Sequence, residues 1–153
     1  MKRTALHAEH QRLGATLVEF AGWEMPVSYS GILAEARAVR HAAGLFDVSH
    51  MGVLDVSGAS APEELDRLVS SVVRDLPEGR ARYALLLNSA GGILDDLLIY
   101  SLAPDRLWVI ANAANAESDC EWIRERVGAQ TRVTPRFGEI AILALQGPRA
   151  LEI

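Results

Sequence analysis

Hydrophobic and polar positions alternate at two different periods along the chain. Apolar residues at helical spacing predict helices over about 4–13, 32–43, 61–73 and 115–126, with Gly14 and Gly44 as stops for the first two. The third of these helices carries its apolar stripe on Leu65, Leu68, Val69 and Val72. We therefore expect helices that each bury one face.

Between these helices, runs of β-prone residues predict strands. They lie near 80–88, 93–102, 106–112, 131–134 and 138–146, and residues 45–57 look extended with an interruption at Ser49 and His50. Residues 16–29 contain Gly22, Pro26 and mixed aromatic residues, which predicts a packed loop with one short strand. The order of strand, helix, three strands, helix and strand predicts an α+β fold with antiparallel hairpins rather than a doubly wound parallel sheet.

Composition narrows the class of protein. Half of the 153 residues are hydrophobic, which is enough for a packed core, and the net charge of −5 disfavours a nucleic-acid binder. A single cysteine, Cys120, excludes an internal disulfide, and its acid-rich helix predicts an inert buried thiol. No apolar run is long enough for a membrane span or a signal peptide, so we expect a cytoplasmic protein.

The last residues predict an interrupted domain. Gly147-Pro148-Arg149-Ala150-Leu151 resembles the first turn of a helix, and the sequence stops at Ile153 before that helix presents a whole apolar face. We expect a truncated chain.

The segment RARYALLLNSAGGILDDLLIY at 80–100 predicts a β-hairpin that carries the chemistry. If its turn spans Ser89 to Gly92, Tyr83 lies opposite Leu98, and strand alternation then places Tyr83 on the same face as Leu94, Asp96, Leu98 and Tyr100. Asp95 points to the other face. A turn that differs by one residue would break this grouping.

Two interpretations of the Asp95-Asp96 pair remain open at this level. Both faces of the strand are mostly apolar, so we expect both to be covered and the carboxylates to be partnered, at an edge, or raised in pKa. Such a carboxylate beside tyrosines can accept a proton from a flat, nitrogen-rich ligand. Alternatively, the acids cap a nearby loop or meet Arg80 or Arg82.

The register of the third strand, 106–112, is also open. A five-residue connection from Ala103 to Leu107 would put Ile110 and Asn112 on the Asp96 face, whereas a four-residue connection would put Val109 and Ala111 there.

Long motifs in the chain resemble the T-protein of the glycine cleavage system, an aminomethyltransferase. They are AGWEMPVSYSGILAEARAVRHAAGLFDVSHMG, GRARYALLLNSAGGILDDLLIY, LWVIANAANAESDCEWI and LALQGPRA, and together they cover essentially the whole chain. The resemblance implies transfer of an aminomethyl group from the lipoyl arm of the carrier (H) protein to tetrahydrofolate, with release of ammonia and formation of 5,10-methylenetetrahydrofolate. It calls for no metal.

The resemblance also implies site residues and domains. The essential aspartate of the family matches Asp96. The folate pocket of the family matches Met51, Tyr83, Asp96, Leu98, Tyr100, Ile110 and Asn112. Residues 53–136 are expected to form a ferredoxin-like, antiparallel α+β subdomain that carries the hairpin, and residues 1–52 with 137–153 part of a second α+β domain.

Other residues and related families give alternative interpretations. His50 in FDVSHMG is a candidate acid or base, although loop histidines are more often hydrogen-bonded scaffolding, and Asp47 and Ser49 are expected to form a turn. The alternative functions are a non-catalytic folate-binding module related to iron–sulfur maturation proteins, and the folate domain of a dimethylglycine or sarcosine dehydrogenase.

Overall fold

The computed structural model describes all 153 residues and divides the chain into two compact units. The first unit comprises Met1–His50 and Ile140–Ile153, and the second comprises Met51–Glu139. Both units mix helices with antiparallel sheets, so the predicted α+β class is confirmed. None of the helices has the length and apolar character needed to cross a membrane.

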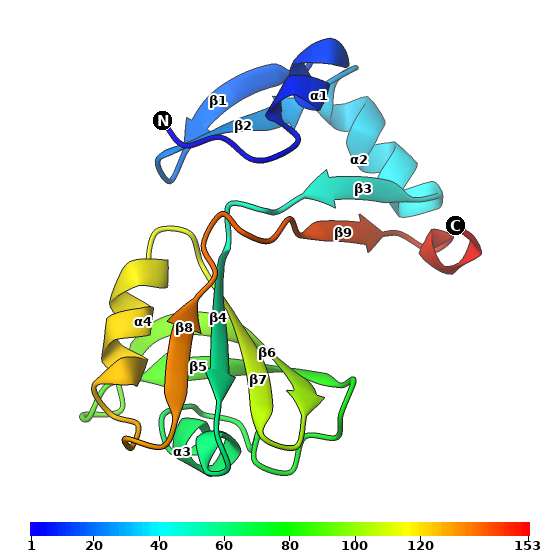
Figure 1. The fold of residues 1–153 in the computed structure, drawn as a ribbon. Coiled ribbons are helices and arrows are strands. Elements are labelled where there is room, and N and C mark those ends of the chain that lie inside the picture. The colour runs from blue at the N-terminus through cyan, green and yellow to red at the C-terminus, as the bar shows by residue number, and fades with distance from the viewer. The chain divides into compact units, whose positions relative to one another are not determined.

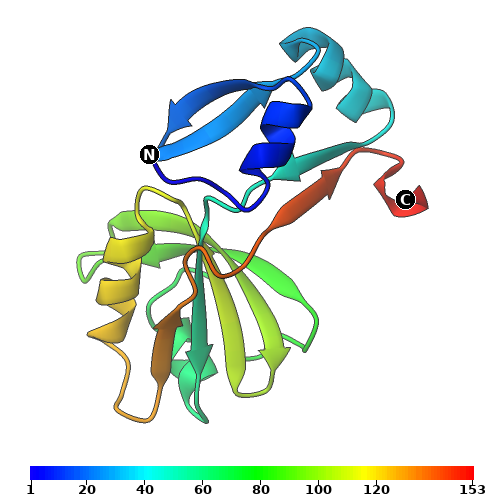
Figure 2. The same cartoon turned by 45° about the horizontal axis from the view of Figure 1, so that its top comes forward.

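The first unit contains two small antiparallel sheets and short helices (Figure 1). Its elements are α1 (His7–Arg12), β1 (Thr16–Phe20), β2 (Trp23–Ser28), α2 (Ile32–His41), β3 (Gly44–Asp47), β9 (Leu143–Gln146) and the 3₁₀ turn η1 (Ala150–Glu152). Strand β1 pairs with β2, and β3 pairs with β9 from the other end of the chain, as Figure 2 shows. The helix at the chain end is therefore a single 3₁₀ turn in this structure.

The prediction for residues 16–29 was wrong, because this segment is a two-stranded hairpin with a register shift between Thr16 and Leu17. Phe20 pairs with Trp23, which leaves Ala21 and Gly22 as a two-residue turn with φ angles of 50° and 82°. Two consecutive residues with positive φ give the turn a twist that matches the flanking strands. Gly22 thus marks a tight hairpin turn instead of an irregular loop.

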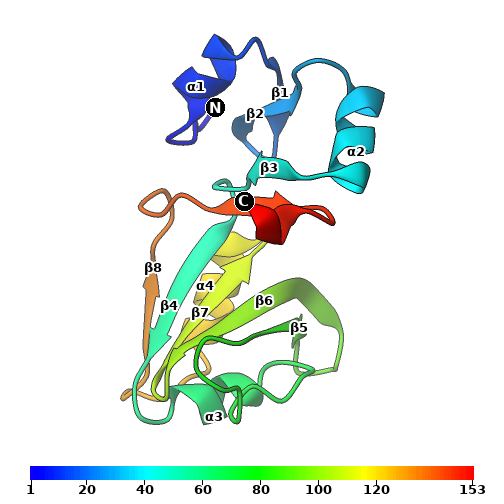
Figure 3. The same ribbon diagram turned by 90° about the vertical axis from the view of Figure 1, so that its right-hand side faces the viewer.

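The second unit is built on a five-stranded antiparallel sheet in the order β5-β6-β7-β4-β8. Its elements are β4 (Gly52–Ser57), α3 (Ala61–Asp66), β5 (Ala81–Leu87), β6 (Ile93–Ala103), β7 (Arg106–Ala111), α4 (Ala116–Arg124) and β8 (Arg132–Pro135). In Figure 3, the strands β4 and β7 lie in front of α4. The three central predicted strands and the helix after them are confirmed, with bounds that differ by one or two residues.

One face of this sheet carries the hydrophobic core. Buried residues of α3 (Leu65) and α4 (Ile123) pack with alternate residues of the strands, such as Leu54, Leu97 and Val109. Because side chains alternate along a strand, the intervening residues point to the opposite face. Neither α3 nor α4 covers that opposite face.

The predicted helix over 61–73 was too long, since α3 ends at Asp66. An Asp66 carboxylate oxygen accepts hydrogen bonds from the backbone N–H groups of Val73 and Arg74, at 2.7 and 3.1 Å. The segment between them runs beside β5, and the Ser70 N–H donates to the Leu85 carbonyl. The apolar spacing did not distinguish the observed short helix from the longer predicted one. Leu65 and Val69 are buried in the structure, as they would be on the inner face of a longer helix.

The strand predicted over 138–146 was also too long. A turn at 137–139 precedes it, and pairing with β3 begins only at Leu143.

We predict that adjacent leucines of β6 differ in their contribution to stability. Leu97 is 1% exposed in the core, whereas Leu98 on the opposite face is half-buried. Leu97→Ala should lower the free energy of unfolding by about 2–5 kcal/mol, because it leaves a cavity, and Leu98→Ala should lower it clearly less. Urea unfolding followed by tryptophan fluorescence measures both, and equal losses would contradict the assignment of faces.

Candidate functional site

The β5–β6 hairpin has the predicted register from Ala81 to Leu86, but its turn is one residue longer than predicted. Leu87 pairs with Ile93, so the turn spans Asn88 to Gly92, and a bulge at Leu94 restores the register. Tyr83 pairs with Leu98, and Leu85 pairs with Asp96. The Asn88 side chain organises the turn, since its Oδ1 accepts hydrogen bonds from the N–H groups of Ala90 and Gly92 at 2.9 Å each. This turn fixes which of the two adjacent aspartates points to each face.

The register of β7 resolves the choice that the sequence left open. Leu98 pairs with Ile110, so Ile110 lies on the Asp96 face, and Asn112, which directly follows β7, continues the same alternation. A bulge between Ser101 and Ala103 accompanies this register. The faces are those of the five-residue alternative, but the predicted connection was wrong: Ala103 pairs with Arg106, so the turn is Pro104 and Asp105, and the bulge sets the faces.

The two faces of β6 differ in exposure, which corrects the expectation that both are covered. Asp95 is 5% exposed and lies among core residues, whereas Asp96 is exposed on the opposite face. On that face Tyr83 is 73% exposed and Tyr100 is 38% exposed. Tyr100 pairs with Ala81, which lies two positions before Tyr83 on β5, so both tyrosines point to the same face. Asp96 therefore lies on an open face that also carries two accessible aromatic rings, Tyr83 on the neighbouring strand and Tyr100 four residues further along β6.

The remaining predicted site residues border this face. Leu98 is half-buried and Ile110 is buried, and both lie in line with Asp96 across the sheet. Met51 directly precedes Gly52, which pairs with Ala111 at the end of β7, so Met51 lies near Asn112. The structure thus brings all seven predicted residues to one face or end of the sheet within the second unit. We call these seven residues the site face: Met51, Tyr83, Asp96, Leu98, Tyr100, Ile110 and Asn112.

Asp96 is held by the side chain of Asn112. Asn112 Nδ2 donates to Asp96 Oδ1 at 3.0 Å and lies 3.2 Å from the Asp96 carbonyl oxygen. The second carboxylate oxygen, Oδ2, has no hydrogen-bond partner within the chain and is accessible to a ligand. An oriented carboxylate beside aromatic rings can accept hydrogen bonds from, and stabilise positive charge on, a nitrogen-containing ring.

Asp95 caps a loop, which is one of the two roles that the sequence left open for the acidic pair. Its carboxylate accepts the backbone N–H of Asn112 at 3.0 Å, Asn112 Nδ2 at 2.9 Å and Asn115 Nδ2 at 2.9 Å. Burial alone would raise the pKa of Asp95, but these hydrogen bonds outweigh it and lower the pKa below the ordinary value. The predicted contacts with Arg80 or Arg82 are not present; Arg82 donates to the Val72 carbonyl.

Sequence reasoning missed Asp119, which faces Asp95 from α4. Asp119 is 3% exposed, and burial together with the neighbouring Asp95 carboxylate raises its pKa to about 7. The buried Oδ2 of Asp119 has no hydrogen-bond partner when the carboxyl group is unprotonated. If Oδ2 carries a proton, it can donate that proton in a hydrogen bond to Asp95. The signal in the sequence was spacing: Asp119 falls on the buried stripe of α4 with Ala116 and Ile123.

In the first unit, Asp47 and Ser49 form the turn that the sequence predicted. Asp47 Oδ1 accepts the Ser49 N–H at 3.0 Å, and the other oxygen lies 2.9 Å from His10 Nε2. His10 Nδ1 lies 2.9 Å from the Tyr29 hydroxyl, a contact that the sequence did not predict. His50 packs edge-on against Phe20, and burial lowers the pKa of its imidazole. Burial favours the neutral form of the ring, and the buried Nδ1 of His50 has no hydrogen-bond partner, so the hydrogen bond expected of a scaffolding histidine is not present.

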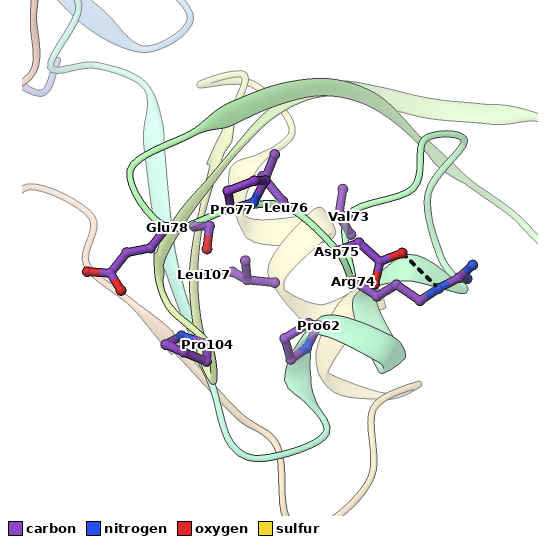
Figure 4. Close-up of a pocket in the computed structure, with 10 residues that line it drawn as sticks. Pro62, Val73, Arg74, Asp75, Leu76, Pro77, Glu78, Pro104 and Leu107 are labelled. Atoms are coloured by element: carbon purple, nitrogen blue, oxygen red, sulfur yellow. Dashed lines mark ion pairs between the residues drawn. The ribbon is translucent and has the colours of Figure 1, made fainter.

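A separate pocket in the second unit does not contain the predicted site. It has a volume of about 290 Å³ and is lined mainly by apolar residues, among them Pro62, Leu107 and Pro104 (Figure 4). Its charged rim includes Arg74 and Asp75, whose side chains form a 3.7 Å ion pair at the surface. None of its lining residues belongs to the site face. No group of three or more His, Cys, Asp or Glu side chains is placed to hold a metal ion.

We predict that Asp119 makes stability depend on pH. Between the ordinary carboxyl pKa of 3.8 and about 7, folded protein keeps a proton on Asp119 that the unfolded chain has lost. The free energy of unfolding should therefore fall as the pH rises through this window, by up to about 1.4 kcal/mol per pH unit. Asp95 has the opposite shift, so its contribution is lost only at lower pH.

The variant Asp119→Asn should lose this slope, and its stability relative to the unsubstituted chain should increase from about pH 5 to about pH 8. Urea unfolding at a series of pH values measures the difference. Glu121→Gln, at an exposed position of the same helix, is the control and should keep the slope. An unchanged slope in Asp119→Asn would show that Asp119 does not hold the proton.

Comparison with known proteins places this geometry in a family. Residues 6–153 match the family model described as the GCVT N-terminal domain. The chain is 47% identical over 151 residues to an aminomethyltransferase of Chloroherpeton thalassium, and 48% identical over 157 residues to one of Symbiobacterium thermophilum. These matches cover 98% and 100% of the chain but 42% of each relative.

A solved structure has the same fold. The aminomethyltransferase T of the glycine cleavage system from Bartonella henselae matches with a TM-score of 0.87 and 40% sequence identity, over 99% of this chain and 42% of that one. Because the family model spans nearly the whole chain and the identities are well above 30%, the chain belongs to the aminomethyltransferase family, within its GCVT N-terminal domain.

Proposed function

We propose that this chain supplies the tetrahydrofolate-binding wall of an aminomethyltransferase of the glycine cleavage system. The observation that supports this most is the site face, where an oriented carboxylate, Asp96, lies on the same open face as Tyr83 and Tyr100. A pterin ring is flat and rich in nitrogen, so it can pack on apolar and aromatic side chains while its nitrogens meet the carboxylate.

In the proposed reaction, an aminomethyl group passes from a lipoyl sulfur of the carrier protein to tetrahydrofolate. Two folate nitrogens each form a bond to the methylene carbon, while its bonds to sulfur and to the amine nitrogen break. The two protons that leave the folate nitrogens balance the thiol and the ammonia that are released. The products are 5,10-methylenetetrahydrofolate, ammonia and the reduced lipoyl arm.

Asp96 has the catalytic role in this proposal. Its accessible Oδ2 would lie against a reacting folate nitrogen and stabilise the positive charge that develops there as the nitrogen attacks. Tyr83, Tyr100 and Leu98 would pack against the pterin, and Met51, Ile110 and Asn112 would border it. The protein then contributes mainly orientation and electrostatics, since the bond-making atoms belong to the substrates.

The proposal extends to the partner and the location of the enzyme. The partner is the lipoylated carrier protein, which brings the aminomethyl group. We place the protein in the bacterial cytoplasm, which agrees with the bacterial relatives and with a single, buried, unpaired cysteine. The chain matches only about 42% of the length of those relatives, so binding of folate, rather than turnover, is the property to test on it.

We predict that tetrahydrofolate binds the chain and that Asp96 contributes to the affinity. Calorimetric titration should show saturable binding at ligand concentrations up to the millimolar range. Asp96→Asn, which keeps the shape but removes the charge, should weaken binding by about 10-fold or more, because a charge-assisted hydrogen bond is lost.

The matched control is Asp105→Asn, which removes an exposed carboxylate from the turn between β6 and β7. It should bind folate like the unsubstituted chain. Absence of binding at millimolar ligand would contradict a folate site in this chain. Equal binding by the unsubstituted chain and Asp96→Asn would contradict the contact assigned to Asp96.

A further inference from the structure

A single nitrogen atom links the two adjacent aspartates. Asn112 Nδ2 lies 2.9 Å from Asp95 Oδ1 and 3.0 Å from Asp96 Oδ1, although the two carboxylates belong to opposite faces of β6. Asn112 directly follows β7, at the point where the chain leaves the sheet, so its side chain can reach both. An amide NH₂ group has two protons, which matches one bond to each carboxylate.

The two ends of this bridge are not equivalent. Asp95 is 5% exposed and accepts three hydrogen bonds, two from Asn112 and one from Asn115. Asp96 is exposed, and Asn112 is its only hydrogen-bond partner through the side chain. The rigid, buried end therefore determines the position of the amide, and the amide determines the position of the exposed end.

We propose that Asp95 is a positioning residue for Asp96, because its buried carboxylate fixes the orientation of the Asn112 amide that holds Asp96. A carboxylate accepts hydrogen bonds and donates none, so Asn112 must turn its NH₂ group, not its oxygen, toward Asp95. The same orientation presents NH₂ to Asp96. The importance of this orientation for catalysis rests on the proposed function of Asp96. The orientation of the Asn112 amide does not depend on that function.

The consequence of losing the charge follows from the same chemistry. An asparagine at position 95 has an NH₂ group of its own, so the Asn112 amide can turn over and accept from it. The Asn112 oxygen would then face the Asp96 carboxylate, which it repels. Asp96 should lose its only side-chain partner and sample several orientations.

Asp119 provides a contrast within the same cluster. It neighbours Asp95 from α4, and its raised pKa of about 7 favours the protonated form, which can donate to Asp95. Asp119→Asn keeps a donor toward Asp95 and keeps Asp95 an acceptor. The orientation of Asn112 should therefore survive this substitution, although it also removes a buried carboxyl group next to Asp95.

The test measures the side-chain orientation of Asp96 in solution by NMR, from its three-bond couplings. In the unsubstituted chain and in Asp119→Asn, the couplings should report one dominant χ1 rotamer. In Asp95→Asn they should report averaging among rotamers, while the backbone spectrum of the sheet stays in place. If Asp95→Asn does not fold, Asn112→Ala replaces it, because this variant keeps the backbone N–H bond to Asp95, and it should show the same averaging.

Tetrahydrofolate titration is the second arm. Asp95→Asn should weaken binding about as much as Asp96→Asn, about 10-fold, whereas Asp119→Asn should change it less than about twofold. An averaged Asp96 rotamer in the unsubstituted chain, or a single rotamer in Asp95→Asn or Asn112→Ala, would overturn the proposal. The absence of folate binding in every variant would contradict the proposed function instead, because the NMR result does not depend on folate.

Discussion

The pairing register of β6 with β5 and β7 decides which of two adjacent carboxylates is buried. Tyr83 opposite Leu98, and Leu98 opposite Ile110, place Asp96 on the open face and Asp95 in the core. Side chains alternate with a period of two, so a shift of one residue would exchange the two acids and turn the whole apolar set of the strand outward. The Asn88 turn and the core contacts of Leu97 and Ile99 both support the observed register.

A buried carboxylate is unfavourable unless hydrogen bonds replace its hydration. Asp95 satisfies this requirement with three N–H donors from the loop that connects β7 to α4, and the raised pKa of the neighbouring Asp119 favours a protonated form that can add a fourth. The same donors tie the loop to the sheet, and one of them extends to Asp96. The cluster thus joins the core to the candidate site, because the Asn112 amide that contacts the buried Asp95 also contacts the exposed Asp96.

The second unit covers one sheet face with its own helices and exposes much of the other. On that other face, Tyr83 presents most of its surface to solvent, and Tyr100 more than a third. These accessible aromatic rings share their face with the oriented Asp96, and this combination is what the proposed ligand site rests on. Members of the aminomethyltransferase family that are 47% and 48% identical to this chain are more than twice its length, so further segments of such proteins are available to complete a pocket.

The sequence by itself determined the fold class, the central hairpin and the separation of Asp95 from Asp96, because these depend on local turn chemistry and on the alternation of side chains. It also identified the family through long motifs. Only the tertiary structure decided the register of β7, the end of α3 at Asp66 and the hairpin of β1 and β2, since each depends on hydrogen bonds that compete with an equally good local pattern. The role of Asp119 likewise needed the structure. A helix pattern shows that Asp119 is buried, but the contact with Asp95 joins two elements that are far apart along the chain.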